Sequence, residues 1–319
     1  MELQTKIPLQ PADNPLDYQS KVVLLGSCFV ENMGSKLDYF KFQQKQNPFG
    51  ILFHPRAIEN LVQRAINEKP YLPIEVFEQD GIWRCFDAHS DLRSDNPEDL
   101  LQLLNQSLKT TQIALEKASH IIITLGTAWV YKHLASEKVV ANCHKVPQKQ
   151  FNKKLLSVQE IEESLSHLIG LISSLNPNTQ IIFTVSPVRH LKDGFVENQQ
   201  SKAHLISSLH SILSSRAQSR NVSYFPSYEI MMDELRDYRF YAKDMVHPNE
   251  LAVDYIWEKF KLVWISEKVY PIMDEVDSVH KGLQHRPFNP DSKGHKKFKT
   301  SLETKITYLQ QHYPFMKFE

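Results

Sequence analysis

The stretch that decides the fold reads Val22-Val23-Leu24-Leu25-Gly26-Ser27-Cys28-Phe29-Val30-Glu31-Asn32. Four consecutive branched apolar residues are typical of a strand buried on both faces, and the chain beyond Gly26-Ser27 can continue as a helix. A serine at this turn would lie at the carboxyl edge of the sheet, where open α/β sheets bind ligands. The pair also fits a plain turn in which Ser27 caps the helix, so its role depends on whether another segment supplies a base.

Two further buried strands are predicted at residues 120–125 and 179–185. Long helices at about 97–118 and 157–175 precede them, and crossovers of this length indicate parallel strands covered by helices. We therefore predict the α/β fold class, as a three-layer α/β/α sandwich around a central, mostly parallel sheet.

Small β-hairpins are expected to leave this sheet. Asp80-Gly81 separates two runs of alternating residues, which is a strong hairpin signal, and a second small hairpin is predicted between residues 129 and 141. Residues 43–53 and 142–152 are interpreted as loops. Pro248 is expected to be the first residue of the last helix of the main domain.

The chain is divided by composition into a main domain at residues 1–265 and a C-terminal helical appendage at 266–319. Beyond about residue 266 the sequence becomes charged, and one final helix is expected at 302–311.

The composition excludes several classes of partner. The chain has 319 residues, with Lys plus Arg and Asp plus Glu at 37 each, so it has no net charge that would attract a polyanion. Residues 1–8 lack the apolar core of a signal peptide, and no apolar run is long enough to cross a bilayer. The 3 cysteines form no C-x-x-C pair, which favours a reducing compartment. We predict a cytoplasmic protein without a nucleic-acid or membrane partner. The oligomeric state stays open.

Asp244 and His247 could form the base that a nucleophilic serine requires. Their spacing lets one loop present a carboxylate beside an imidazole, so that one ring nitrogen is held and the other faces outward. A nucleophilic serine needs such a base, because its free hydroxyl is protonated at neutral pH. The order of the chain allows Ser27 and His247 to meet above the sheet edge. The alternative for Asp244 and His247 is a turn that caps the last helix.

An acyl-transfer site also needs hydrogen-bond donors for the developing oxyanion, each worth roughly 3 kcal/mol. The candidates are the backbone N–H of Ser27, the loop around Gly50, and Gly126-Thr127 at the end of the second strand. Gly50 and Thr127 could instead be ordinary turn residues.

Gly26-Ser27-Cys28-Phe29 resembles the signature of the GSCFA domain family, with Val30 in place of the final alanine. That family resembles the SGNH, or GDSL-type, hydrolases, which implies a flavodoxin-like sandwich and serine-dependent ester hydrolysis. The resemblance assigns Ser27 as nucleophile, His247 as base, Asp244 as its orienting acid and Gly50 as an oxyanion donor. Further strings resemble the family in order: Asn47-Pro48-Phe49-Gly50-Ile51, Thr124-Leu125-Gly126-Thr127-Ala128-Trp129, Ser186-Pro187-Val188-Arg189-His190 and Asp244-Met245-Val246-His247-Pro248.

Two positions depart from the SGNH pattern. Gly26 stands where those enzymes have Asp before the serine, and the segment after Gly126 lacks the Asn that donates to the oxyanion. The hydroxyl of Thr127 could donate instead. Cys28 is interpreted as a packing residue, since its place in the helix would turn it away. The remaining predicted substrate-binding residues are Asn47, Gly126, Arg189 and His190.

The predicted function is that of a serine-dependent carboxylic-ester hydrolase which removes a small acyl group, such as acetyl, from a carbohydrate or small metabolite. No metal is expected, because the histidines show no metal-ligand spacing, and no cofactor is expected. Two alternatives stay open: an acyltransferase using the same residues, and an SGNH-like scaffold that binds without turnover.

Overall fold

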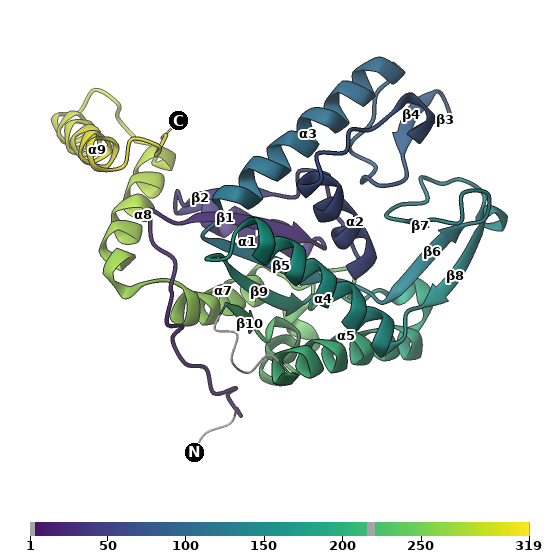
Figure 1. Cartoon of the computed structure of the whole chain (residues 1–319). Helices are drawn as coiled ribbons and strands as arrows, with labels where there is room; N and C mark the ends of the chain where they lie inside the picture. The colour runs from purple at the N-terminus through teal and green to yellow at the C-terminus, as the bar shows by residue number, and fades with distance from the viewer. Residues whose placement is uncertain (1–3, 216–220, 319) are drawn as a thin grey trace.

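The central sheet contains five parallel strands in the order β10-β9-β5-β1-β2 (Figure 1). In the computed structural model, which describes residues 4–215 and 221–318, the three inner strands are apolar and almost wholly buried. This confirms the predicted α/β fold class. The strand bounds are β1 (Lys21–Gly26), β2 (Gln43–Gln46), β5 (His120–Leu125), β9 (Gln180–Val185) and β10 (Val222–Tyr224).

Helices cover both faces of the sheet because side chains along each strand alternate between the faces. Val23 and Leu25 of β1 pack in the core below one helix layer, and Val22 and Leu24 pack in the core below the other. The first layer consists of α2 (Pro55–Ile66), α3 (Pro97–Lys117), α4 (Val158–Leu175) and α5 (Phe195–Ser215). The second contains α1 (Phe29–Tyr39), the π-helical turn Ile230–Glu234 that follows α6 (Ser227–Glu229), α7 (Glu250–Trp264) and α8 (Tyr270–Gln284).

Most helices begin where the sequence signals predict. Asn96 caps α3 through a bond from the Asp99 N–H, and Ser157 with Glu160 forms the capping box of α4. The prediction for Pro248 was wrong. Asn249 caps α7 instead, because Pro248 is held one residue earlier in a β-bridge with Tyr241.

Two small antiparallel sheets leave the main fold. β3 (Val76–Gln79) and β4 (Ile82–Cys85) form the hairpin predicted around Asp80-Gly81. The second hairpin is also confirmed, as β6 (Trp129–His133) with β7 (Val139–Val140), but a third strand, β8 (Phe151–Leu155), pairs with β6.

The loops predicted at 43–53 and 142–152 were each too long, because β2 and the start of β8 lie inside them. Gln43–Gln46 is polar throughout, since β2 is an edge strand and is only half-buried. In β8 the three residues after Phe151 are exposed, so no alternating pattern marks the strand.

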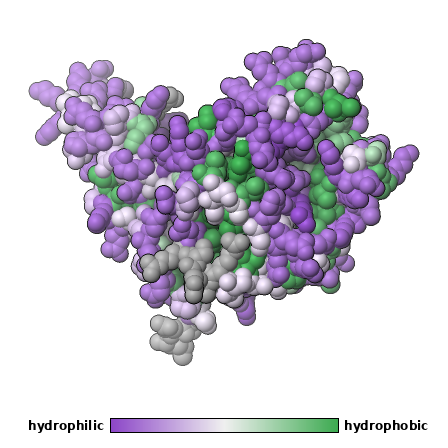
Figure 2. All heavy atoms as spheres, in the orientation of Figure 1, coloured by the Kyte–Doolittle hydropathy of each residue, from purple (hydrophilic) through white to green (hydrophobic). Residues whose placement is uncertain are grey.

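The C-terminal segment packs onto the α1 side of the sheet. Met273, Val276 and Val279 of α8 are buried in the same core as α1 and α7. α9 (Lys293–His312) is longer than the predicted 302–311, buries only Leu309, and lies in a mostly hydrophilic part of the surface (Figure 2). The boundary between 1–265 and 266–319 stays a prediction, and residues 1–3 and 319 lie outside the described ranges. Within those ranges, no helix combines the length and apolar character needed to cross a bilayer.

Candidate active site

Ser27 follows β1 directly and is fully buried. Its N–H donates to the carbonyl of Thr124 over 3.0 Å, but its Oγ has no hydrogen-bond partner among the described residues. The hydroxyl does not cap α1, since that helix begins at Phe29 without a side-chain cap. The simple capping role for Ser27 is therefore not seen, and its hydroxyl is available for another contact.

Gly26 explains one departure from the SGNH pattern. Its φ of +133° is a backbone conformation that side-chain-bearing residues rarely adopt. A Cβ placed there would lie 2.1 Å from the Thr124 carbonyl oxygen. An aspartate does not fit this backbone conformation, which explains why a glycine precedes Ser27. The neighbouring Cys28 is half-buried, and burial raises the pKa of its thiol, which disfavours the nucleophilic thiolate.

Asp244 and His247 form the pair that their spacing predicts. The Nδ1–H of His247 donates to Asp244 Oδ2 over 2.7 Å, while Asp244 Oδ1 accepts from the backbone N–H groups of Val246 and His247. These bonds, led by the one from the His247 N–H, lower the pKa of Asp244 to about 2. The carboxylate thus engages Nδ1, so that Nε2 is the nitrogen a general base would use. The same contacts make the turn considered as the alternative, yet Asp244 does not cap α7.

Arg189 joins the His247 loop to the loop after β9. Its N–H donates to the Val246 carbonyl over 3.2 Å, and its guanidinium lies 4.1 Å from the centre of the Tyr241 ring. The next residue, His190, is therefore held beside the His247 loop.

His190 lies between that loop and the serine. A Cβ placed on Gly126 would be 3.0 Å from Ser27 Cβ and 3.2 Å from His190 Nε2, so all three residues meet at one point. Burial, with the nearby charges of Lys202 and His247, lowers the pKa of His190 to about 3. The ring is thus neutral at ordinary pH.

The His247 loop lies beside the loop that carries His190, but no hydrogen bond joins His247 to Ser27 in the described part of the chain. Catalytic hydrogen bonds are often long in unliganded enzymes and tighten with substrate. The triad of Ser27, His247 and Asp244 stays a prediction.

The predicted backbone donors already have partners inside the protein. Gly50 N–H donates to the carbonyl of Asn47 over 2.7 Å, within a tight turn in which Gly50 has φ +69°. The N–H groups of Gly126 and Thr127 both donate to the carbonyl of Phe53, over 2.8 and 3.0 Å. An oxyanion could use these groups only if those bonds broke.

The hydroxyl of Thr127 is also engaged. It lies 3.0 Å from Ser201 Oγ and accepts from the Trp129 N–H over 3.0 Å. Thr127 is buried, and these contacts place its side chain against α5. Its proposed use in place of the missing Asn stays a prediction without support from these contacts.

Asn47, unlike the donors above, has a side-chain N–H group without a partner. Its Oδ1 accepts the Gly26 N–H over 2.9 Å, one residue before the serine. Its Nδ2 is buried and has no partner among the described residues. Asn47 therefore offers a free N–H group close to the end of β1.

Lys202 on α5 was missed by the sequence analysis. It is fully buried, and its Nζ donates to the carbonyls of Gly126 and Ser186 over 2.7 Å each, so it joins the ends of β5 and β9. Burial lowers its pKa to about 7. A signal was present, since Lys202 shares a helical face with buried Asn198 and Leu205.

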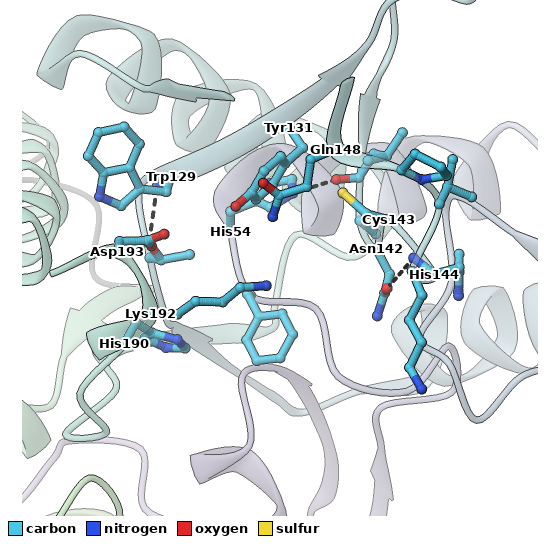
Figure 3. A pocket seen from close by; sticks show the side chains of 17 residues that line it. His54, Trp129, Tyr131, Asn142, Cys143, His144, Gln148, His190, Lys192 and Asp193 are labelled. Atoms are coloured by element: carbon cyan, nitrogen blue, oxygen red, sulfur yellow. Dashed lines mark hydrogen bonds between the residues drawn. The ribbon is translucent and has the colours of Figure 1, made fainter. Parts of the chain in front are cut away.

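A pocket of about 560 Å³ is lined by Thr127 and His190, of which His190 lies next to Ser27, while Ser27 itself does not line the pocket. Figure 3 shows His190 and Lys192 on one side of it and Cys143 and Asn142 on the other. Trp129 and Tyr131 of β6 also line it. The pocket is thus lined by both aromatic and polar side chains.

The buried histidines of this pocket serve the fold. His54 caps α2 by accepting the Ala57 N–H and binds the carbonyl of Val140 through Nε2, while burial lowers its pKa to about 4. His144 binds the carbonyl of Cys85, and burial likewise lowers its pKa to about 4. No group of three or more potential metal ligands occurs within residues 4–215 and 221–318.

The chain matches a known protein family. The model of the GSCFA family matches residues 21–260, and that of the C-terminal domain of GSCFA domain proteins matches 276–319. No curated protein matches. Among solved structures, a Clostridium thermocellum family 3 carbohydrate esterase is 10% identical with a TM-score of 0.35, over 80% of this chain and 97% of that chain. An acetyl xylan esterase from the rumen bacterium Butyrivibrio proteoclasticus is 13% identical with a TM-score of 0.38, over 85% and 66%.

The parallel five-stranded sheet with helices on both faces, and the serine after β1, beside the central strand β5, define an α/β protein. The chain belongs to the GSCFA family.

Proposed function

We propose that this protein is a serine-dependent carboxylic-ester hydrolase that removes a small acyl group, such as acetyl, from a carbohydrate or small metabolite. The observation that carries the proposal is the Asp244–His247 pair, bonded over 2.7 Å and held beside the loop that reaches Ser27. The freedom of the Ser27 hydroxyl from any capping role supports it.

The chemistry would proceed in two steps. Ser27 Oγ attacks the ester carbonyl carbon while His247 Nε2 accepts the serine proton, and the imidazolium then protonates the departing alcohol oxygen. Water, activated by the same imidazole, hydrolyses the acyl-serine. Asp244 keeps the ring in the required tautomer and balances its positive charge.

The adjoining pocket supports the substrate class. Its volume of about 560 Å³ lies within the range of small-molecule sites. Trp129 and Tyr131 provide aromatic surface, while Asn142 and Gln148 provide polar groups, a combination that suits a sugar ring or a similarly polar metabolite. The small acyl group would lie at Ser27 and the alcohol part in the pocket.

Replacement of Ser27 tests the proposal directly. Ser27→Ala should reduce hydrolysis of short p-nitrophenyl esters by at least about a thousandfold, because the acyl-enzyme cannot form. Cys28→Ala is the matched control and should keep near-normal activity, since the thiol packs at the start of α1. Unchanged hydrolysis by Ser27→Ala would remove Ser27 from the mechanism.

The two alternatives have their own readouts. A fluorophosphonate probe that labels Ser27 in the wild-type protein would exclude a scaffold without turnover. Product analysis with sugar alcohols present would distinguish acyl transfer from hydrolysis, because both use the same acyl-serine.

A further inference from the structure

Several buried side-chain polar atoms near the end of β1 have no hydrogen-bond partner among the described residues, and Ser27 Oγ, Asn47 Nδ2 and His190 Nε2 are among them, beside Thr124 Oγ1. A buried polar group left unpaired costs about 1–3 kcal/mol. Such groups are few in folded proteins, and catalytic use is one reason to retain them. Their grouping around one serine points to a ligand atom that would pair with them.

Asn47 is fixed by its other contacts. Its N–H donates to the Leu24 carbonyl over 2.9 Å, its carbonyl accepts from Gly50, and its Oδ1 accepts from Gly26. With Oδ1 occupied, only Nδ2 is left to contact a ligand. The amide orientation follows from the hydrogen-bond network, since an N–H group facing the Gly26 N–H would be repelled.

His190 is fixed from the other side. Its backbone N–H donates to Asn198 Oδ1 over 2.9 Å, and its ring meets the Phe53 ring edge to face at a centroid distance of 5.6 Å. Its Nε2 reaches the point shared by Gly126 and Ser27. A neutral imidazole can donate one hydrogen bond from this nitrogen without adding charge to the buried site.

We infer that Asn47 Nδ2–H and His190 Nε2–H form the oxyanion hole of this site, in place of the paired backbone N–H groups and of the Asn absent after Gly126. This role rests on the proposed hydrolase function. As Ser27 Oγ bonds to the carbonyl carbon, the carbonyl π pair moves onto oxygen, and both donors bond to that oxygen. When the carbonyl re-forms, the C–O bond to the alcohol breaks, and the alcohol oxygen takes its proton from His247.

Asn47→Asp removes the donor of Asn47 and adds a negative charge that also opposes an oxyanion, while the new carboxylate still accepts the Gly26 N–H. Aspartate also tolerates the φ of +38° found here. We expect a loss of at least about a hundredfold in kcat with KM within about threefold, as for one oxyanion donor. Asn96→Asp makes the same chemical change at the N-cap of α3 and is the matched control.

His190→Ala and His190→Gln separate donation from base catalysis. Glutamine keeps an N–H donor but cannot accept the serine proton, so it should recover about tenfold of the roughly hundredfold loss in His190→Ala. Thermal unfolding of each variant identifies losses caused by misfolding, because a structural effect would lower the melting temperature together with activity.

Wild-type kcat in Asn47→Asp and in His190→Ala would overturn the inference and leave the proposed function intact. Glutamine no better than alanine at residue 190 would overturn the donor role of His190. If the wild-type protein neither hydrolyses esters nor is labelled at Ser27, the proposed function fails first, and the oxyanion hole fails with it.

Discussion

At the scale of single residues, the site depends on which proton each side chain holds. Asp244 has a pKa of about 2, below the usual value near 3.9, because backbone and ring N–H groups bind its charged form. A carboxyl group with a lowered pKa stabilises the fold above pH ~4, and this stabilisation is lost as the pH falls toward 2. Asp244 is therefore ionised throughout any ordinary assay, and its carboxylate can accept a hydrogen bond from Nδ1 of His247.

Asp244→Asn should keep the geometry of the loop and change the tautomer of the His247 ring. The new side chain can still accept from the backbone N–H groups, but its amide faces Nδ1 with a donor and moves the ring proton to Nε2. We expect kcat/KM to fall by about a hundredfold or more, the usual contribution of a general base. Ester hydrolysis from pH 5 to 9 measures this, with the exposed Asp233→Asn as control. Equal rates in wild type and Asp244→Asn would show that the pair is only a turn.

The contact between Asp244 and His247 and the position of Ser27 after β1 could be predicted because their signals are local. Asp244 and His247 lie on one loop, and Ser27 directly ends an apolar strand. The proximity of His190 to Ser27 comes from packing between loops of different strands, so no spacing encodes it. The partner of each backbone donor, such as the Phe53 carbonyl, is equally invisible in sequence.

At the scale of elements, α5 is attached to the sheet by a lysine rather than only by apolar contacts. Lys202 binds the carbonyls that follow β5 and β9. In the sheet, β5 lies next to β1, which ends at the serine, and β9 lies next to β5. A neutral amine has two N–H groups, enough for both carbonyls. The attachment of α5 to the sheet thus depends on the titratable amine of Lys202.

Lys202 predicts a pH dependence of stability. Its pKa is about 7 when folded and about 10.4 when unfolded, so between these values the unfolded chain binds the extra proton and stability rises with pH. From pH 7 to 9 this amounts to on the order of 2 kcal/mol. Urea unfolding of wild type and Lys202→Met at both pH values should show this rise only in the wild type. Identical slopes in the two proteins would contradict a neutral buried lysine.

The elements that could be predicted are those with strong apolar runs or caps. β1, β5 and β9 are continuous apolar strands, and α3 and α4 begin at Asn96 and Ser157. β2 and β8 could not be predicted, because strands with polar, partly exposed side chains carry no period.

At the scale of the whole molecule, α8 completes the core on one side of the sheet. The Tyr39 hydroxyl donates to Asp277 over 2.8 Å, and His280 binds the Tyr39 carbonyl over 2.9 Å. Beside these bonds lie the buried side chains of α8 described above. The segment after residue 265 is therefore expected to matter for stability.

Two truncations test this expectation. Ending the chain after Ile265 exposes the partners of three buried α8 side chains and should cost on the order of 5 kcal/mol. Ending it after His285 should cost less, because among the described residues it removes two buried side chains, Leu309 of α9 and Met316. Thermal unfolding and gel filtration of both forms measure stability and assembly. Equal melting temperatures for the full chain and the form ending at Ile265 would show that 266–319 is an independent appendage.

The two outermost strands of the sheet have a consequence for aggregation. An open sheet offers unpaired N–H and C=O groups along its borders, and another copy could polymerise on them. Here β10 spans only Val222–Tyr224, and β2 is four polar residues with an exposed Lys45. Edge strands that are this short or charged offer an incoming strand few backbone groups to pair with and no apolar surface to pack on. The sheet therefore resists edge-to-edge pairing and fibril growth.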